Sequence, residues 1–252
     1  MKQSKKKEVL KDLYQTCMQR NNFMKNIVVL TGAGISAESG ISTFRDSNGL
    51  WENYRIEDVA NFDSFEKDEE LVTKFYNARR RQLTQVEPNE GHKQLVRLEE
   101  KYNVNIVTQN VDDLHERAGS KHIIHLHGEL TKACSRSDKQ EIYEIGYHDI
   151  TPMDVDKKGQ MLRPFIVWFG EAVPEIENAA KLCENADILI IVGTSLVVYP
   201  AAGLMHYCKK NCKKYLIDPK RPEADLSNIT FIQEKASTGV KQVVDELLQC
   251  DL

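Results

Sequence analysis

The sequence has 252 residues, of which 41% are hydrophobic and 29% are charged, and its formal net charge is −4. This composition is ordinary for a soluble globular protein with one large domain, or with a major domain and a smaller lobe. The acidic balance provides no basic surface for nucleic acid, and the longest aliphatic run, Ile188 to Val192, is too short to span a bilayer. The charged N-terminus lacks an apolar signal core. We therefore expect a cytoplasmic protein without nucleic-acid or membrane partners.

Apolar spacing predicts a succession of strands and helices along the chain. Residues 4–22 have helical spacing, and residues 27–30 form an apolar run of the buried-strand type. Further strands are expected at 104–108, 122–126, 165–169, 187–192, 214–217 and 229–232. Helical patterns occur at 89–102, 175–186, 200–211 and 237–249. This alternation favours an α/β fold, with a parallel sheet covered by helices on both faces.

Two stretches interrupt the alternation. Residues 47–88 are expected to be helical without a strand, and residues 131–162 are polar and turn-prone. We therefore expect residues 1–252 to form a single unit with two lobes. The larger lobe is assigned to 25–46, 89–130 and 163–252, and the smaller inserted lobe to 47–88 and 131–162. A cleft between two lobes is a usual place for a ligand.

The first strand ends in a glycine-rich turn. Gly32, Ala33 and Gly34 begin a G-x-G-x-x-G/A pattern that contains Ser36 and precedes an expected helix. Glycines in such a turn allow the backbone to approach a pyrophosphate, which the helix N-terminus stabilises. The position of the pattern after a strand favours a Rossmann-like nucleotide site, although a tight turn without a ligand would carry the same pattern.

The next segment argues against a dehydrogenase. A dinucleotide-dependent dehydrogenase has a second strand with an acidic residue about 20 positions beyond the glycines. Here the interval contains Thr43 to Trp51, and the next apolar strand begins only near Val104. A dinucleotide site interrupted in this way suits a chemistry other than hydride transfer.

Five segments in this order resemble the sirtuin family: GAGISAESGISTFRD (32–46), TQNVDDLHERAG (108–119), HLHGEL (125–130), RPFIVWFGE (163–171) and VGTSLVVYPAA (192–202). The resemblance covers about residues 25–250. It implies an enzyme that consumes NAD as cosubstrate and removes acyl groups from lysines of proteins or peptides. The implied products are nicotinamide, O-acyl-ADP-ribose and free lysine.

The resemblance implies two catalytic residues, His127 and Asn110. His127 would take a proton from a ribose hydroxyl, and a neutral imidazole with an ordinary pKa of about 6.5 suits that role. Asn110 would order water and the ribose. A histidine at the end of a strand is by itself more often structural than catalytic, and His125 is interpreted as such a structural neighbour.

Further residues are implied to contact NAD. Gln109 would contact the ribose and Asp112 the nicotinamide amide, although Asp112 could also cap the following helix. Phe44 would shield the reacting carbon from water, and Arg45 would meet a phosphate. Asp218 stands where the family commonly has asparagine, and it could accept hydrogen bonds from ribose hydroxyls. The remaining implied contacts are made by the Gly32–Ala33–Gly34 turn, Ser36, Gly193, Thr194, Ser195 and Ala236.

Tyr76 and Arg79 match a pair that the sirtuin resemblance links to acidic acyl groups. Three residues apart on a helix, they share one face, and a guanidinium beside a phenol suits a carboxylate. Ala60 falls where a small residue leaves room for a longer acyl chain. We expect activity on succinyl- and malonyl-lysine as well as acetyl-lysine. The alternative is a solvated basic helix face, since Arg79, Arg80 and Arg81 are consecutive.

The sequence also matches the family's peptide-binding segment, but it lacks most of the cysteines of the family's zinc site. Val167, Trp168, Phe169 and Gly170 match the segment that pairs with the substrate peptide. Most sirtuins bind a structural zinc through two CxxC pairs, but here Cys134 alone remains and residues 135–162 contain no cysteine. One thiolate cannot form a tetrahedral zinc site, so we expect no metal. We also expect a monomer.

Two alternative functions share the NAD cleft. An NADase or ADP-ribosyltransferase would break the same bond without needing the peptide segment or the pair Tyr76 and Arg79. A non-catalytic NAD-binding regulator would be expected to lack His127 or Asn110, and both are present.

Overall fold

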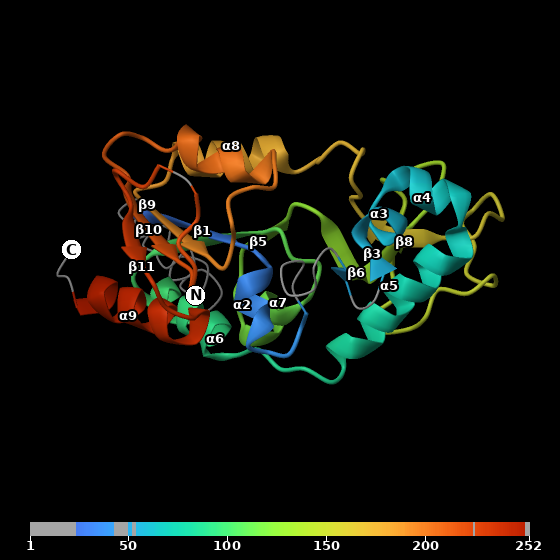
Figure 1. The fold of residues 1–252 in the computed structure, drawn as a ribbon, viewed down its shortest axis with the longest axis horizontal. Helices are drawn as coiled ribbons and strands as arrows, with labels where there is room; N and C mark the ends of the chain where they lie inside the picture. The colour runs from blue at the N-terminus through green and yellow to red at the C-terminus, as the bar shows by residue number, and fades with distance from the viewer. Residues whose placement is uncertain (1–23, 43–49, 52–53, 224, 250–252) are drawn as a thin grey trace, which may run out of the picture.

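The computed structural model describes residues 24–42, 50–51, 54–223 and 225–249. These residues form two lobes, a larger one around a parallel sheet and a smaller one around the helices α3, α4 and α5 (Figure 1). The expected helix at 4–22 and the predicted site residues Phe44 and Arg45 lie outside the described residues. Within the described part of the chain, no helix is both long and apolar enough to cross a membrane.

The larger lobe is built on a six-stranded sheet with the order β11-β10-β9-β1-β4-β5. All its neighbouring strands run parallel. The strands are β1 (Asn26–Thr31), β4 (Asn103–Thr108), β5 (Ile123–His125), β9 (Ile188–Val192), β10 (Lys213–Ile217) and β11 (Thr230–Ile232). The expected fold class, a Rossmann-like sheet with a smaller additional lobe, is confirmed.

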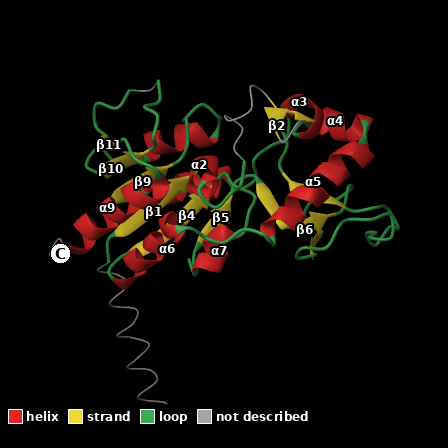
Figure 2. Ribbon diagram, turned by 60° about the horizontal axis from the view of Figure 1, so that its bottom comes forward, coloured by secondary structure: helices red, strands yellow, loops and turns green. Residues whose placement is uncertain are grey.

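Helices cover both faces of this sheet because its central strands are apolar on both sides (Figure 2). Ile27 and Val29 pack with α6 (Glu90–Arg97), η1 (Leu98–Glu100) and α9 (Ala236–Gln249). Val28 and Leu30, which point to the other face, pack with α8 (Ile176–Glu184) and η2 (Ala201–Tyr207).

One expected helix differs in type. The stretch expected to be helical at 200–211 forms the 3₁₀ helix η2, which ends at Tyr207. Over only two turns, apolar residues repeated every 3.0 and every 3.6 residues fall at nearly the same positions, so the sequence pattern could not separate the two helix types.

The smaller lobe combines helices with two short antiparallel sheets. Its helices are α3 (Ile56–Val59), α4 (Phe62–Lys67) and α5 (Glu69–Leu83). One sheet pairs β2 (Leu50–Trp51) with β3 (Tyr54–Arg55), and the other has the order β7-β6-β8. Its strands are β6 (Gly128–Cys134), β7 (Ile142–Glu144) and β8 (Arg163–Ile166).

Two expectations about this lobe were wrong. Residues 47–88 were expected to lack a strand, yet they contain β2 and β3. The apolar run at 165–169 was expected to join the parallel sheet, but its first part belongs to β8, which pairs antiparallel with β6. Residues 163–166, assigned to the larger lobe, thus belong to the smaller sheet. A buried apolar strand has the same composition in either sheet, and only long-range pairing decides between them.

A buried ion pair fixes the turn that follows β8. The guanidinium of Arg163 donates to both carboxylate oxygens of Glu171, at 2.9 and 3.1 Å, and the two side chains are 2% and 4% exposed. The same guanidinium lies 3.8 Å from the ring centre of Trp168. Removing Glu171 would leave the buried Arg163 guanidinium without its carboxylate, a loss that typically costs about 3–5 kcal/mol, whereas Glu171 also pairs with Lys139. The pair therefore holds residues 167–171 in one conformation.

Candidate active site

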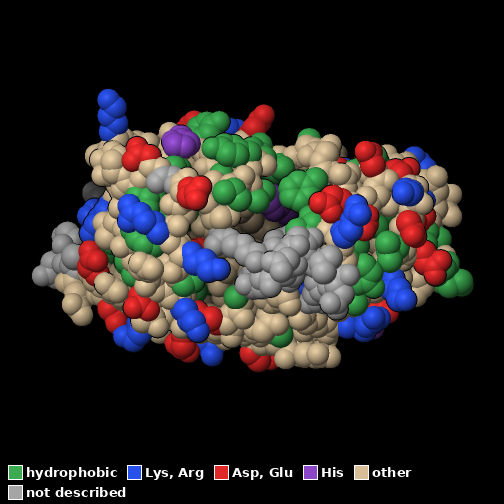
Figure 3. All heavy atoms as spheres, in the orientation of Figure 1, with side chains coloured by type: hydrophobic (Ala, Val, Ile, Leu, Met, Phe, Trp, Pro, Cys, Tyr) green, Lys and Arg blue, Asp and Glu red, His purple; other side chains and the backbone are tan. Residues whose placement is uncertain are grey.

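The predicted site residues gather at the carboxyl ends of β9, β1 and β4. From β1 the chain proceeds to β4 and β5 on one side of the sheet, then returns to β9, β10 and β11 on the other. The loops after β1 and β9 therefore diverge at a topological switch point, where open α/β sheets bind their ligands. Here the surface is hollowed between the two lobes, and a histidine side chain is visible inside the hollow (Figure 3).

The loops after β1 and β9 lie in direct backbone contact. Gly34, in α2 (Ala33–Ala37), donates its N–H to the carbonyl of Gly193 at 2.9 Å. A Cβ on Gly34 would lie 2.6 Å from the Gly193 Cα, and one on Gly32 would lie 2.8 Å from the Thr194 Cβ. The backbone of Gly32 is extended, with φ −123°, so this glycine is required for space rather than for an unusual conformation. The glycines that were expected to make room for a pyrophosphate therefore also allow the loops after β1 and β9 to pack against each other.

Asn110 is held against the glycine turn by its side chain. Its Nδ2 donates to the carbonyl of Gly32 and to Ser36 Oγ, both at 3.1 Å. Its backbone N–H donates to Thr108 Oγ1 at 3.0 Å. Asn110 is only 8% exposed, so these bonds fix its carboxamide beside the loop that follows β1.

Asp112 is buried beside the same group of residues. Its Oδ2 accepts a hydrogen bond from Ser36 Oγ at 2.9 Å, and its Oδ1 accepts one from the N–H of Leu114 at 3.2 Å. Leu114 is the first residue of α7 (Leu114–Ala118), so Asp112 bonds the first turn of this helix, although the N-cap residue is Asp113, which makes no side-chain cap bond. Burial raises the pKa of Asp112, and the two hydrogen bonds oppose that shift.

His127 lies between the lobes, two residues beyond β5. Its Nδ1 is 3.0 Å from the carbonyl of Gln109, and a carbonyl can only accept a hydrogen bond. In the neutral ring the proton is therefore on Nδ1, which leaves the lone pair on Nε2. Burial lowers the pKa of His127, although the hydrogen bond to Gln109 opposes this shift. The ring is thus neutral near pH 7 and can accept a proton at Nε2.

The residue after His127 must be glycine. Gly128 has φ +83°, and a Cβ there would lie 2.0 Å from the carbonyl oxygen of Phe165 in β8. Backbone contact between β6 and β8 therefore begins immediately beside the candidate base.

The other predicted NAD contacts lie along the same edge of the sheet. Gln109 Nε2 donates to Thr194 Oγ1 at 3.2 Å, which joins the loops after β4 and β9. Ser195 is half-buried. Asp218 follows β10, is 2% exposed and accepts a hydrogen bond from the N–H of Lys220 at 2.9 Å. Ala236 begins α9 and its side chain packs in the core, so any contact to a ligand would use its backbone.

This arrangement fits a dinucleotide. Glycine backbone lies at the switch point, and hydroxyl, amide and carboxylate groups from three adjacent strand ends face the same edge. These groups suit phosphate oxygens, ribose hydroxyls and an amide respectively.

Tyr76 and Arg79 are buried in α5. They are 1% and 4% exposed, so they are not part of a solvated basic face. Tyr76 Oη accepts a hydrogen bond from Trp168 Nε1 at 3.0 Å, and Arg79 donates to Gln82 at 2.9 Å. Burial raises the pKa of Tyr76, while hydrogen bonding and the nearby charge of Arg79 lower it, so the phenol keeps its proton.

The rest of the arginine run also departs from the alternative interpretation. Arg80 is fully buried and donates to the carbonyl of Leu130 and to Asn77. Arg81 alone is exposed, and it pairs with Asp149 at the surface. The consecutive arginines thus face three different environments.

The segment expected to pair with a peptide is already bonded along much of its backbone. Val167 N–H donates to the carbonyl of His127, and Phe169 N–H donates to that of Ala60, both at 2.9 Å. Trp168 N–H donates to Glu171 at 3.0 Å. A peptide would therefore have to use other backbone groups here, such as those of Gly170. The Phe169 side chain is 51% exposed and offers an apolar contact.

The small lobe does not fit the zinc site of the resembled family. The lobe offers the buried thiol of Cys134, and residues 135–162, all of them described, contain no second cysteine to complete a tetrahedral site. Hydrogen bonds connect the two ends of the loop after β6 instead: Ser135 Oγ donates to Asp156 at 2.6 Å. Asp156 also accepts the N–H groups of Lys158 and Gln160, both at 2.9 Å.

A buried polar chain behind the site was not predicted. Thr31 Oγ1 donates to Thr108 Oγ1 at 2.8 Å, and His115 Nε2 lies 3.1 Å from Thr31 Oγ1. Threonine as the last residue of both β1 and β4 is a visible signal in the sequence. The contact with His115 is not visible there, because it depends on how α7 packs on the sheet.

The fold and the site define an α/β protein with a dinucleotide-type site at a switch point and a histidine oriented as a base. The Sir2 family model matches residues 32–200. The chain belongs to the Sir2, or sirtuin, family, which confirms the resemblance found in the sequence.

Similar proteins agree in sequence and structure. An NAD-dependent protein deacylase of Bacteroides thetaiotaomicron is 54% identical over 233 residues, covering 89% of this chain and 99% of the relative. One of Helicobacter pylori is 51% identical over 227 residues, covering 90% and 99%. A Sir2 homologue in complex with NAD has 37% identity and a TM-score of 0.80, covering 93% of this chain and 94% of its own. A Sir2 complex with a p53 peptide and NAD has 30% identity and a TM-score of 0.72, covering 93% and 98%.

The contact between the two loops yields a stability prediction. Gly34→Ala should lower the free energy of unfolding by about 1–3 kcal/mol, because the added Cβ meets backbone that cannot rotate away. Helix propensity alone would predict a gain of about 1 kcal/mol for the same change. Chemical denaturation measures the difference. Gly203→Ala is the matched control, since its Cβ would meet only Tyr199 side-chain atoms, at 3.7 and 3.9 Å. Equal stability of the two variants would contradict the steric argument.

Proposed function

We propose that this protein is an NAD-dependent deacylase of protein lysines. The observation that carries the proposal is the orientation of His127, whose Nδ1 bonds the Gln109 carbonyl at 3.0 Å and leaves Nε2 as a base. The names of the similar proteins and the complexes of Sir2 with NAD and peptide support it. A cytoplasmic location and a monomeric state are part of the same proposal.

The residues of the chain divide the work as follows. NAD, as cosubstrate, supplies the glycosidic bond that is broken and the ribose hydroxyl that receives the acyl group. Asn110, fixed by Gly32 and Ser36, positions the ribose, and Asp112 accepts from the nicotinamide amide. His127 takes the proton of the ribose hydroxyl at Nε2. Because burial lowers the pKa of His127, its base form persists at pH values below the ordinary histidine range.

His127→Ala tests the role of the base. Removal of a general base typically costs a factor of about 100–10,000, so kcat/KM for deacylation should fall by that factor. Product release from an acetyl-lysine peptide, followed by mass spectrometry, gives the rate. His122→Ala is the control, since His122 is exposed and lies just before β5. A His127→Ala variant within tenfold of the parent enzyme would refute the assignment.

The same assay, run with and without acyl peptide, distinguishes a deacylase from an NADase. A deacylase releases nicotinamide only when acyl peptide is present, because the acyl oxygen is the group that captures the ribose carbon. An NADase releases nicotinamide from NAD alone. Release at equal rates with and without peptide would favour the alternative.

Acidic acyl groups form part of the proposed substrate range, together with acetyl. Tyr76 and Arg79 offer a protonated phenol and a guanidinium from one buried helix face, a combination that binds a carboxylate. Ala60, only 5% exposed, follows α3, belongs to the same buried cluster as Tyr76 and has a side chain of one carbon. Succinyl- and malonyl-lysine carry the matching carboxylate.

Arg79→Met tests this specificity. Loss of a charge-assisted hydrogen bond costs about 1.5–3 kcal/mol, so kcat/KM for a succinyl peptide should fall about 10- to 100-fold. Activity on the acetyl form of the same peptide should change much less. The control is Arg81→Met, which removes an exposed guanidinium on the same helix. Equal losses on the two peptides in Arg79→Met would show that Arg79 does not read the acyl group.

The absence of structural zinc is also proposed. The buried thiol of Cys134 and the hydrogen bonds between Ser135 and Asp156 support it. Metal analysis of the purified protein should give well under one zinc per chain, and a chelator should leave the melting temperature unchanged. Close to one zinc per chain would overturn the proposal.

A further inference from the structure

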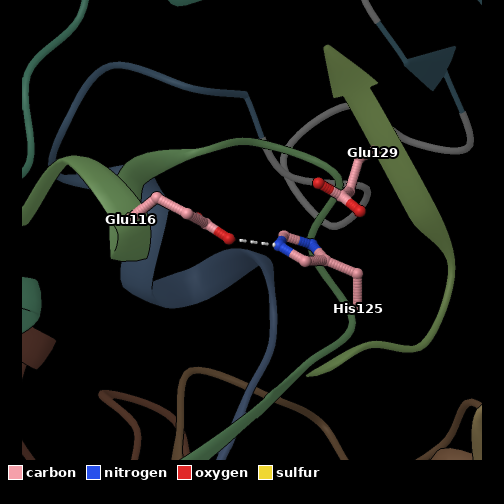
Figure 4. Close-up of side chains that lie close together, drawn as sticks. All are labelled: Glu116, His125 and Glu129. Carbon is pink, nitrogen blue, oxygen red and sulfur yellow. Dashed lines mark hydrogen bonds and ion pairs between the residues drawn. The ribbon is translucent and has the colours of Figure 1, made fainter. Parts of the chain in front are cut away.

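His125, the last residue of β5, has hydrogen-bond acceptors at both ring nitrogens. Its Nε2 lies 2.7 Å from Glu116 Oε1, and its Nδ1 lies 3.1 Å from the carbonyl of Asn110. The side chain is 7% exposed. Figure 4 shows the carboxylate of Glu116, in α7, pointing at the ring of His125. Glu129, in β6, lies close to the same ring.

These two contacts determine the charge of the ring. A carbonyl and a carboxylate can only accept hydrogen bonds, so each ring nitrogen needs its own proton. Either neutral tautomer would place a nitrogen lone pair against an acceptor oxygen in a nearly buried site. The Glu116 side chain is 40% exposed, and its hydrogen bond with His125 lowers the pKa of its carboxyl despite the opposing effect of burial, so the carboxylate is the form that faces the ring. The geometry is therefore satisfied by the imidazolium.

The charges around the His125 ring also favour the imidazolium. Burial alone would lower the pKa of His125, but the hydrogen bond to Glu116 and the charges of Glu116 and Glu129 outweigh it and raise the pKa. Lys132, also on β6, lies 2.7 Å from Glu129 and neutralises part of its charge.

Two further titratable groups face His125 from β4 and α7. Asp112 follows β4, and its carboxylate is stabilised by the charge on His125. His115 is buried in α7, and burial keeps its pKa well below the ordinary value, so it adds no competing charge near pH 7.

We propose that His125 is a positioning residue that acts as an imidazolium and holds the peptide carbonyl of Asn110 in place. The inference rests on the proposed function, in which Asn110 positions the ribose. Asn110 is then fixed at its side chain by Gly32 and Ser36, at its N–H by Thr108 and at its carbonyl by His125. When the imidazolium loses a proton, the remaining proton stays on Nε2, where the carboxylate of Glu116 lies 2.7 Å away, and Nδ1, 3.1 Å from the carbonyl, is deprotonated. The carbonyl of Asn110 is then released, and the ribose contact loosens.

The proposal gives the two histidines opposite requirements. His127 must be neutral to accept a proton, whereas His125 must be charged to hold Asn110. Activity is therefore highest between the two pKa values and declines as the pH rises through that of His125. The decline is several-fold rather than complete, because the side-chain bonds of Asn110 remain.

A direct test measures the charge of the ring in the full-length protein. Nitrogen-15 NMR of histidine-labelled protein, with His125 assigned from a His125→Gln variant, should show both ring nitrogens protonated at pH 7. His127 should show one unprotonated nitrogen under the same conditions. A neutral His125 ring at pH 7 would overturn the proposal. So would displacement of its Nε2 proton by added Zn²⁺, since the group would then be a metal site formed by Glu116, His125 and Glu129.

The link to activity is tested by Glu116→Gln, which keeps the shape of the side chain and removes its charge. The pKa of His125 should fall by about one unit, and the alkaline decline of kcat/KM for NAD should move to lower pH by the same amount. Glu70→Gln, which changes an exposed carboxylate of α5, is the control and should move neither. A lower pKa without a shifted pH profile would show that His125 is merely structural.

The two proposals can fail separately. The NMR titration does not depend on catalysis, so a protein without deacylase activity would still report the charge of His125. Conversely, a deacylase with the expected dependence on His127 and a neutral His125 would retain the proposed function and lose only this inference.

Discussion

Two consecutive peptide carbonyls hold the histidines of this site. The carbonyl of Gln109 lies 3.0 Å from Nδ1 of His127, and the carbonyl of Asn110 lies 3.1 Å from Nδ1 of His125. Between the histidines, Leu126 donates its N–H to the carbonyl of Thr108 at 2.9 Å, so the segment continues the parallel pairing of β4 with β5. The orientation of both rings therefore follows from the register of two neighbouring strands.

The same kind of bond leads to opposite chemistry in the two rings. Each histidine presents Nδ1 to a carbonyl, and the difference lies in what meets Nε2. For His125 that partner is the carboxylate of Glu116, which favours the charged ring. For His127, which lies between the lobes, burial dominates and favours the neutral ring. In the proposed mechanism, a single strand end thus supplies one cation and one base, two residues apart.

Much of this arrangement could be predicted from local patterns. Apolar runs of strand length predicted the parallel sheet, the glycine turn at Gly32 indicated a nucleotide site after β1, and the resemblance to the sirtuin family indicated the other strand ends of the candidate site. Local patterns could not assign residues 165–169 to a sheet, because the pairing of β8 with β6 is a long-range choice. They could not show that Arg79 and Arg80 are buried while Arg81 is exposed, since burial depends on what packs against α5.

His125 shows most clearly what local sequence patterns could not predict. Its interpretation as a structural neighbour of His127 was all that its position in the chain supported. Glu116 lies nine residues away, in α7, and only the packing of that helix beside β5 brings its carboxylate to the ring. The chemistry of a histidine depends on the partners of both nitrogens, and neither partner of His125 is adjacent to it in the sequence.

The small lobe is coupled to the site through the backbone around the candidate base. The carbonyl of His127 accepts the N–H of Val167, and Gly128 immediately begins β6, where β8 leaves no room for a Cβ. Val167 adjoins Trp168, whose ring lies under Arg163 and whose indole N–H bonds Tyr76. Tyr76, which is proposed to help read the acyl group, is therefore connected to the proposed base through Trp168 and Val167. The buried pair of Arg163 and Glu171 fixes the turn that contains Trp168.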